Sequence, residues 1–124
     1  MKWLSMAMVT AMLSTSVLVS KPAMANDALV VSICNFVAAD DKNRLRKKLK
    51  SNKVKLRNIY DGVSCNGMTL LQFSMQKKSN NVGKYIVKRL SSNKLKSGTD
   101  WKWATDNGFA ESEVALAIKA RAGF

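Results

Sequence analysis

Histidine is missing from this 124-residue chain, acidic residues number only 8, and there are two cysteines and one proline. Without histidine, the common triads of serine and cysteine hydrolases have no general base, and the usual zinc sites lose a principal ligand. Cys34 and Cys65 do not form a Cys-x-x-Cys motif, so neither a zinc ribbon nor a thioredoxin-like redox motif is indicated. We therefore expect no metal, no cofactor and no enzymatic activity.

Two pairs of acidic residues are placed where helices are expected to begin. Asp40-Asp41 lies at an expected helix start, and Glu111 and Glu113 lie in the first turn of the last expected helix, where carboxylates satisfy free amide groups and favour the helix dipole. Capping is therefore favoured over acid–base catalysis. No glycine-rich phosphate loop and no acidic calcium loop occurs in the sequence. The alternative that stays open is a small secreted hydrolase or toxin-like effector that uses lysine and carboxylates against an anionic polymer.

The beginning of the chain has the layout of a secretory signal peptide. Lys2 is followed by a run without charge over residues 3–19, and then by Lys21 and the small-residue pattern Ala23-Met24-Ala25. We expect cleavage after Ala25 and a periplasmic or secreted product, with residues 26–124 forming one domain. An uncleaved membrane anchor is the alternative, because the apolar run approaches the length that spans a bilayer.

In an oxidising compartment the two cysteines are expected to pair. A domain of this size has a thin core, so a cross-link is useful to it. Closing the loop from Cys34 to Cys65 would contribute about 3–4 kcal/mol in the chain-entropy model. Two free buried thiols are the alternative.

Apolar spacing predicts helices along most of residues 26–124. Residues 28–39 are nearly all apolar and predict a helix that is buried on most sides and capped by Asn26 or Asp27. A second, more solvent-exposed helix is expected from residue 42 to about 50, and residues 51–68 are interpreted as a long loop. Thr69 and Gln72 form a capping-box pattern ahead of a helix that stops near residue 77. A further helix is expected around residues 82–90, where Val82, Ile86 and Leu90 form one apolar stripe. Others are expected after Thr99 and up to residue 122, with residues 92–98 as a linker.

Two of these segments resemble the ankyrin repeat. In residues 99–108, TDWKWATDNG, Thr is expected to cap a short helix, small residues follow five and six positions later, and Gly follows at position nine; residues 69–75 match the front of the same signature. The Pro and His that follow Thr in that family are absent here, and the interval from Thr69 to Thr99 is shorter than the family's. The resemblance implies an all-α fold of three stacked helical hairpins with one long disulfide-tethered loop, in a divergent small secreted bacterial family of unknown function. A plain irregular helical bundle is the alternative.

The strongest functional pattern is electrostatic. Without residues 1–25 the chain keeps 19 basic and 8 acidic residues, a net charge of +11. Residues 42–57 hold nine cations and no acid. A run of like charge is either a solvated surface or a docking site for an anion. The predicted anion-binding residues are Lys42, Arg44, Arg46, Lys47, Lys48, Lys50, Lys53, Lys55 and Arg57.

These features predict a non-enzymatic exported interaction module. Its partner is expected to be an acidic protein, an anionic lipid or an envelope polyanion, and peripheral membrane contact stays open. Nucleic acid is disfavoured, because no aromatic residue is interleaved with the cations for base stacking. Trp101 and Trp103 are two positions apart on an expected helix, so they point to different sides, and an exposed one would be an interface anchor. A structural subunit that buries this face against another chain is a further alternative.

Overall fold

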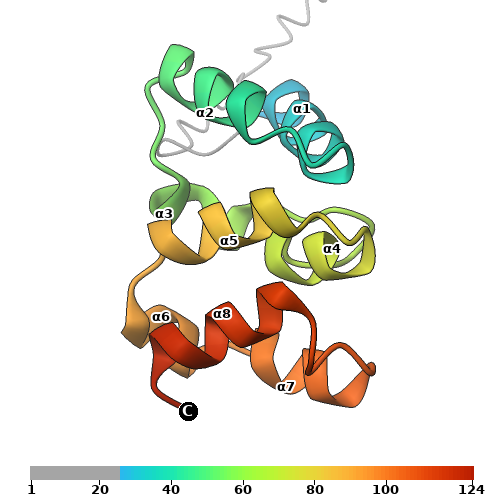
Figure 1. Cartoon of the computed structure of the whole chain (residues 1–124). Helices are drawn as coiled ribbons and strands as arrows, with labels where there is room; N and C mark the ends of the chain where they lie inside the picture. Colours follow the sequence, from blue (N-terminus) through green and yellow to red (C-terminus); the bar gives the residue numbers. More distant parts are fainter. Residues whose placement is uncertain (1–25) are drawn as a thin grey trace, which may run out of the picture.

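The computed structural model describes residues 26–124, and the expected signal peptide, residues 1–25, lies outside them. The described residues form an all-helical fold (Figure 1), which confirms the predicted class. Within them the nearest approach to a strand is an isolated bridge between Cys65 and Met68. The helices are α1 (Asp27–Ala38), α2 (Lys42–Ser51), α3 (Leu56–Ile59), the 3₁₀ turn η1 (Tyr60–Gly62), α4 (Leu70–Gln76), α5 (Asn80–Arg89), α6 (Ser92–Ser97), α7 (Asp100–Asp106) and α8 (Glu113–Ala122).

Several helix starts follow directly from local sequence. The side chain of Asn26 accepts from the amide of Leu29 at 2.8 Å, as expected for a cap of α1. The predicted capping box is present at α4, where the Thr69 hydroxyl accepts from the Gln72 amide and the Gln72 side chain accepts from the Thr69 amide. The Ser112 hydroxyl caps α8 by accepting from the Ala115 amide at 3.1 Å. These starts are encoded within four residues of each helix.

Two predicted connections are wrong, because they contain helices. The expected loop at residues 51–68 holds α3 and η1, which bury Leu56, Ile59 and Tyr60. These residues are three and four positions apart, a helical spacing that the surrounding Asn and Gly residues obscure. The expected linker at residues 92–98 forms α6, which is capped by Ser91 and anchored by the buried Leu95.

Three finer predictions also need correction. Helix α1 is not buried on most sides: Leu29, Ile33 and Val37 face the core, but Val31 is 59% exposed. Thr99 makes no side-chain capping bond to α7. Glu111 lies ahead of α8, so Glu113 is the acidic residue of its first turn. A helix that packs against the core along one face buries a single apolar stripe, and its other apolar residues remain exposed.

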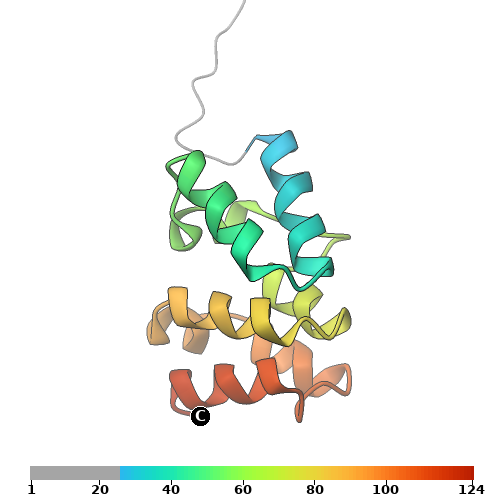
Figure 2. The ribbon, with the colours of Figure 1, turned by 45° about the horizontal axis from the view of Figure 1, so that its top comes forward.

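The helices form three levels. Figures 1 and 2 show α1 and α2 at one end, α3 to α5 in the middle, and α6 to α8 at the other end. Within the levels α1 packs on α2, α4 on α5 and α7 on α8; between the levels α1 contacts α4, and α5 contacts both α2 and α8. The core therefore runs through all three levels, with the C-terminal ends of α2, α5 and α8 near one another on one side.

The same turn ends the first long helix of each level. After α1, α4 and α7 the chain enters the left-handed region at Asp40, Lys78 and Gly108, with φ of 53°, 56° and 80°. One residue further on, a backbone amide donates to the carbonyl five positions earlier, as in a Schellman motif. These bonds are Asp41 to Phe36 (2.9 Å), Ser79 to Ser74 (2.8 Å) and Phe109 to Ala104 (2.7 Å).

The Asp40-Asp41 pair serves two helices. Asp41 caps α2 by accepting from the Arg44 amide at 3.0 Å, as predicted. Asp40 instead reaches the next level, where its carboxylate accepts from the Val82 amide at 2.8 Å and from the Asn81 side chain at 3.0 Å. Ser79, at the cap position of α5, makes no capping bond with its side chain. Asp40, in the turn after α1, thus supplies the side-chain cap that Ser79 does not give to α5.

The predicted disulfide is confirmed. Cys34 of α1 is bonded to Cys65, with a Cα–Cα distance of 5.7 Å. The bond joins the first level to the segment between η1 and α4. Because it closes a loop across two levels, it restricts the unfolded chain and so favours the folded state.

Candidate functional site

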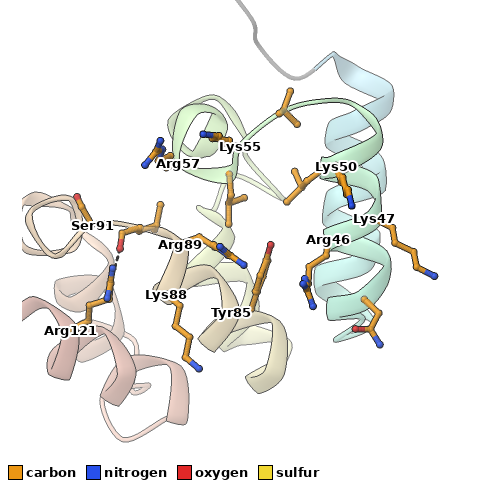
Figure 3. A pocket seen from close by; sticks show the side chains of 15 residues that line it. Arg46, Lys47, Lys50, Lys55, Arg57, Tyr85, Lys88, Arg89, Ser91 and Arg121 are labelled. Carbon is orange, nitrogen blue, oxygen red and sulfur yellow. Dashed lines mark hydrogen bonds between the residues drawn. The ribbon is translucent and has the colours of Figure 1, made fainter.

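A groove of about 950 Å³ opens where α2, α3 and α5 meet and extends to the end of α8 (Figure 3). Apolar and neutral side chains contribute to its lining, including Leu49, Val54, Leu56, Tyr85 and Leu90. The charged residues in the lining are all cations, and all eight are solvent-exposed. We call this site the basic groove; its cations are Arg46, Lys47, Lys50, Lys55, Arg57, Lys88, Arg89 and Arg121.

The structure brings five of the nine predicted cations into the basic groove. They lie on the last two turns of α2 and at the start of α3. The remaining four are elsewhere: Arg44 pairs with Asp41 at 3.4 Å, and Lys53 adopts a φ of 53° in the turn after α2. The four predicted residues outside the groove lining are Lys42, Arg44, Lys48 and Lys53. A run of charge on a helix wraps around it, so only part can face one neighbour.

Three groove cations were not predicted as site residues. Lys88 and Arg89 come from the last turn of α5, and Arg121 comes from the last turn of α8. Each of α2, α5 and α8 ends with basic residues, which favour the negative end of the helix dipole. That shared feature is visible in the sequence, but its use in one site requires the three helix ends to be adjacent.

Within residues 26–124, no acidic side chain neutralises the charge of the basic groove. In residues 26–124, ion pairs within 4.0 Å join Arg44 to Asp41, Lys84 to Glu113, Lys94 to Asp61 and Lys102 to Asp106. No groove cation belongs to any of these pairs. Cations that line one concavity without counter-charges concentrate a positive potential there, which attracts anions.

Two groove arginines are oriented by neutral partners. The Nε of Arg121 donates to the carbonyl oxygen of Leu90 at 2.7 Å, shown by the dashed line in Figure 3. The guanidinium of Arg89 lies over the ring of Tyr85, 5.1 Å from its centroid. Neither contact removes charge, and each leaves most of the guanidinium donors available. These two side chains are therefore better ordered for binding an anion than a free surface lysine.

Trp101 and Trp103 lie outside the groove lining. Both are half-buried and pack against the core. Trp101 stacks on Phe124 with ring centroids 6.0 Å apart, and Trp103 stacks on Phe109 at 5.3 Å. Their proposed role as an interface anchor stays a prediction.

Apart from the basic groove, a cluster of polar side chains is buried between the second and third levels. Asp100, which is 5% exposed, accepts hydrogen bonds from the hydroxyls of Tyr60 and Thr69, both at 2.7 Å, and from the side-chain amide of Gln72 at 3.1 Å. Burial first, and then the neighbouring Asp100 carboxylate, raise the pKa of the Tyr60 hydroxyl well above its ordinary range. Sequence reasoning assigned no role to Asp100.

The hydrogen bonds of this cluster account for its role in holding the fold together. Three neutral donors converge on one carboxylate, so the buried charge is hydrogen-bonded on both oxygens. The cluster ties η1, α4 and α7 together beside a cavity of about 150 Å³. Within residues 26–124, no three His, Cys, Asp or Glu side chains gather as metal ligands. No helix in that range is both long and apolar enough to cross a membrane.

A family model described as "Protein of unknown function (DUF3718)" matches residues 33–97, which is more than half of the chain. The protein therefore belongs to this family. The matched segment includes the disulfide and every groove cation except Arg121. No curated protein and no solved structure matches the chain.

Proposed function

We propose that this member of the family is a non-enzymatic exported interaction module that docks an anionic partner in the basic groove. The observation that carries the proposal is the lining itself: eight exposed cations of one concavity, from separate parts of the chain, without a carboxylate partner in residues 26–124. Mutual repulsion makes such a lining unfavourable unless an anion occupies it.

The expected electrostatic gain is large enough for a physiological complex. Near an anionic surface each Lys or Arg contributes about 1 kcal/mol. Contact with only four of the eight groove cations would then strengthen binding by about a thousandfold. Because these side chains are exposed, the gain should fall steeply as salt screens the interaction.

The proposed compartment is the cell envelope or the exterior, where acidic proteins, anionic lipids and polyanions are the available partners. Support comes from the signal-peptide pattern in residues 1–25 and from the Cys34–Cys65 disulfide, a bond typical of exported proteins.

We also propose that the helix pairs are divergent ankyrin-like repeats. The support is the packing of helices in pairs, α1 with α2, α4 with α5 and α7 with α8, together with the Thr69 capping box. Stacked repeats expose equivalent positions of successive units on one surface. The basic last turns of α2, α5 and α8 would occupy such equivalent positions.

The test distinguishes binding at the basic groove from non-specific attraction by the net charge of the protein. One variant removes four groove cations: Arg46→Gln, Lys47→Gln, Lys50→Gln and Lys55→Gln. The matched control removes four cations from the same segment outside the groove: Lys42→Gln, Arg44→Gln, Lys48→Gln and Lys53→Asn, where Asn tolerates the positive φ. Both variants have the same net charge. Retention on a heparin column and binding to phosphatidylglycerol vesicles are measured across a salt series.

We expect the groove variant to lose most of its retention, while the control stays close to the native protein. Equal losses in both variants would mean that total charge, and not the basic groove, attracts the polyanion. Heparin recovered in shortened form would point instead to the hydrolase alternative.

A further inference from the structure

The basic groove crosses all three levels of the fold. Lys47 and Lys50 belong to the first level, Arg89 to the second and Arg121 to the third. An occupant that meets all of these cations must therefore be extended along the direction in which the levels are stacked. A single small anion would contact only part of this lining.

The groove has two walls, and this shape disfavours a flat partner. In Figure 3, Arg46 of α2 lies opposite Tyr85 and Arg89 of α5, and α3 lies beside α5. Cations that face one another across a concavity cannot all touch a planar bilayer. A chain that enters the groove can reach both walls.

The lining also contains apolar surface among the charges. Val54 and Tyr85 are half-buried and line the groove, with the buried Leu49, Leu56 and Leu90 behind the charged rim. A polyphosphate or a sulfated polysaccharide offers anionic groups but has no aliphatic side chain to place there. An acidic polypeptide has both carboxylates and aliphatic side chains.

From these observations we infer that the occupant is an extended acidic segment of another protein, with carboxylates at Arg89 and Arg121 and an aliphatic side chain between Val54 and Tyr85. This inference rests on the proposed function. The planar guanidinium matches a carboxylate with two parallel hydrogen bonds, which lysine cannot provide. Since both arginines are already held by neutral partners, less order has to be imposed on binding.

The test uses two synthetic peptides of equal length and equal glutamate content. Leucines separate the glutamates in one peptide, and serines replace those leucines in the other. Polyphosphate of matched charge and phosphatidylglycerol vesicles serve as competitors. Binding is measured by calorimetry with the whole domain, its disulfide intact. Burying one aliphatic side chain should make the leucine peptide bind about fivefold more tightly or better.

Two single substitutions probe the two halves of the inference. Val54→Thr keeps the shape but replaces a methyl group with a hydroxyl, so it should abolish the preference for leucine and leave the serine peptide unaffected. Arg121→Lys keeps the charge but loses the planar fork, so it should weaken both peptides by about fivefold at unchanged salt dependence. Thermal melting of each variant verifies that the domain is folded.

The outcomes distinguish this inference from the proposal it rests on. If both peptides bind equally well and the four-residue groove variant still weakens them, the groove docks anions but does not select acidic polypeptide. Tighter groove-dependent binding of polyphosphate or vesicles would likewise overturn the choice of partner. If the groove variant binds every probe as the native protein does, the proposed function itself fails.

Discussion

Gly83→Ala should destabilise this protein, although the same change in most helices is favourable. Gly83 lies in α5 and faces α8, and it is buried. A Cβ atom placed there would lie 2.3 Å from Cγ2 of Val114 and 2.9 Å from Oγ of Ser74. Both neighbours are completely buried, so neither can move into solvent. The absence of a side chain at residue 83 is what allows the second and third levels to approach.

Two effects of opposite sign decide the magnitude. Alanine is favoured over glycine within a helix by about 1 kcal/mol. Overpacking a tight core costs about 1–3 kcal/mol, and here the cost should be at the upper end, because Val114 is β-branched and has little rotamer freedom in a helix. The net loss should be about 1–2 kcal/mol, which corresponds to a fall in Tm of roughly 4–15 °C for a domain of this size.

The assay is urea and thermal denaturation of Gly83→Ala, Val114→Ala and the double variant. Val114→Ala leaves a cavity and should also destabilise the protein. In the double variant the new methyl occupies that cavity, so the combined loss should be smaller than the sum by about 1 kcal/mol or more. A Gly83→Ala variant as stable as the native protein, or losses that simply add, would contradict a steric conflict between residue 83 and Val114.

Two further predictions concern the polar contacts that join the levels. Asp40→Ala should cost about 1–2 kcal/mol by removing the cap of α5 and leaving Ala at a positive φ, whereas Asp40→Asn keeps an acceptor and should cost less; equal losses in urea denaturation would contradict the tertiary cap. Tyr60 has a raised pKa in the folded state, so its contribution is fully present below the unfolded pKa of about 10 and is lost as the pH rises above that value. Stability should therefore fall less steeply above about pH 10 in Tyr60→Phe than in the native protein, and parallel curves from denaturation at several pH values would exclude this role.

Local sequence predicted most of the helices, because their signals are short-range. The cap at Asn26, the box of Thr69 with Gln72, and the apolar stripe of Val82, Ile86 and Leu90 each act within one or two turns, and the structure has each of them. The missed helices α3 and α6 are four and six residues long. Helices that short are stabilised by the core that they contact, and their own sequences carry little periodicity.

The candidate site was predicted in part. The basic segment at residues 42–57 contributes five groove cations, and charge runs of this kind are visible without a structure. Arg121 is far away in the chain, and its guanidinium is placed by the carbonyl of Leu90. No spacing rule connects these positions.

Composition, caps and helical periodicity by themselves determined the all-α class, the segments most of the helices occupy, the pair of cysteines that join, and the region of greatest positive charge. Tertiary structure alone decided that Asp40 caps α5 and that the ends of α2, α5 and α8 share one groove. The physical reason is that a cap or an apolar stripe depends on neighbours within a few residues. Whether distant helix ends lie close together depends on how the buried faces of successive levels pack. At residue 83 this close packing requires glycine, because a Cβ atom there would collide with Val114.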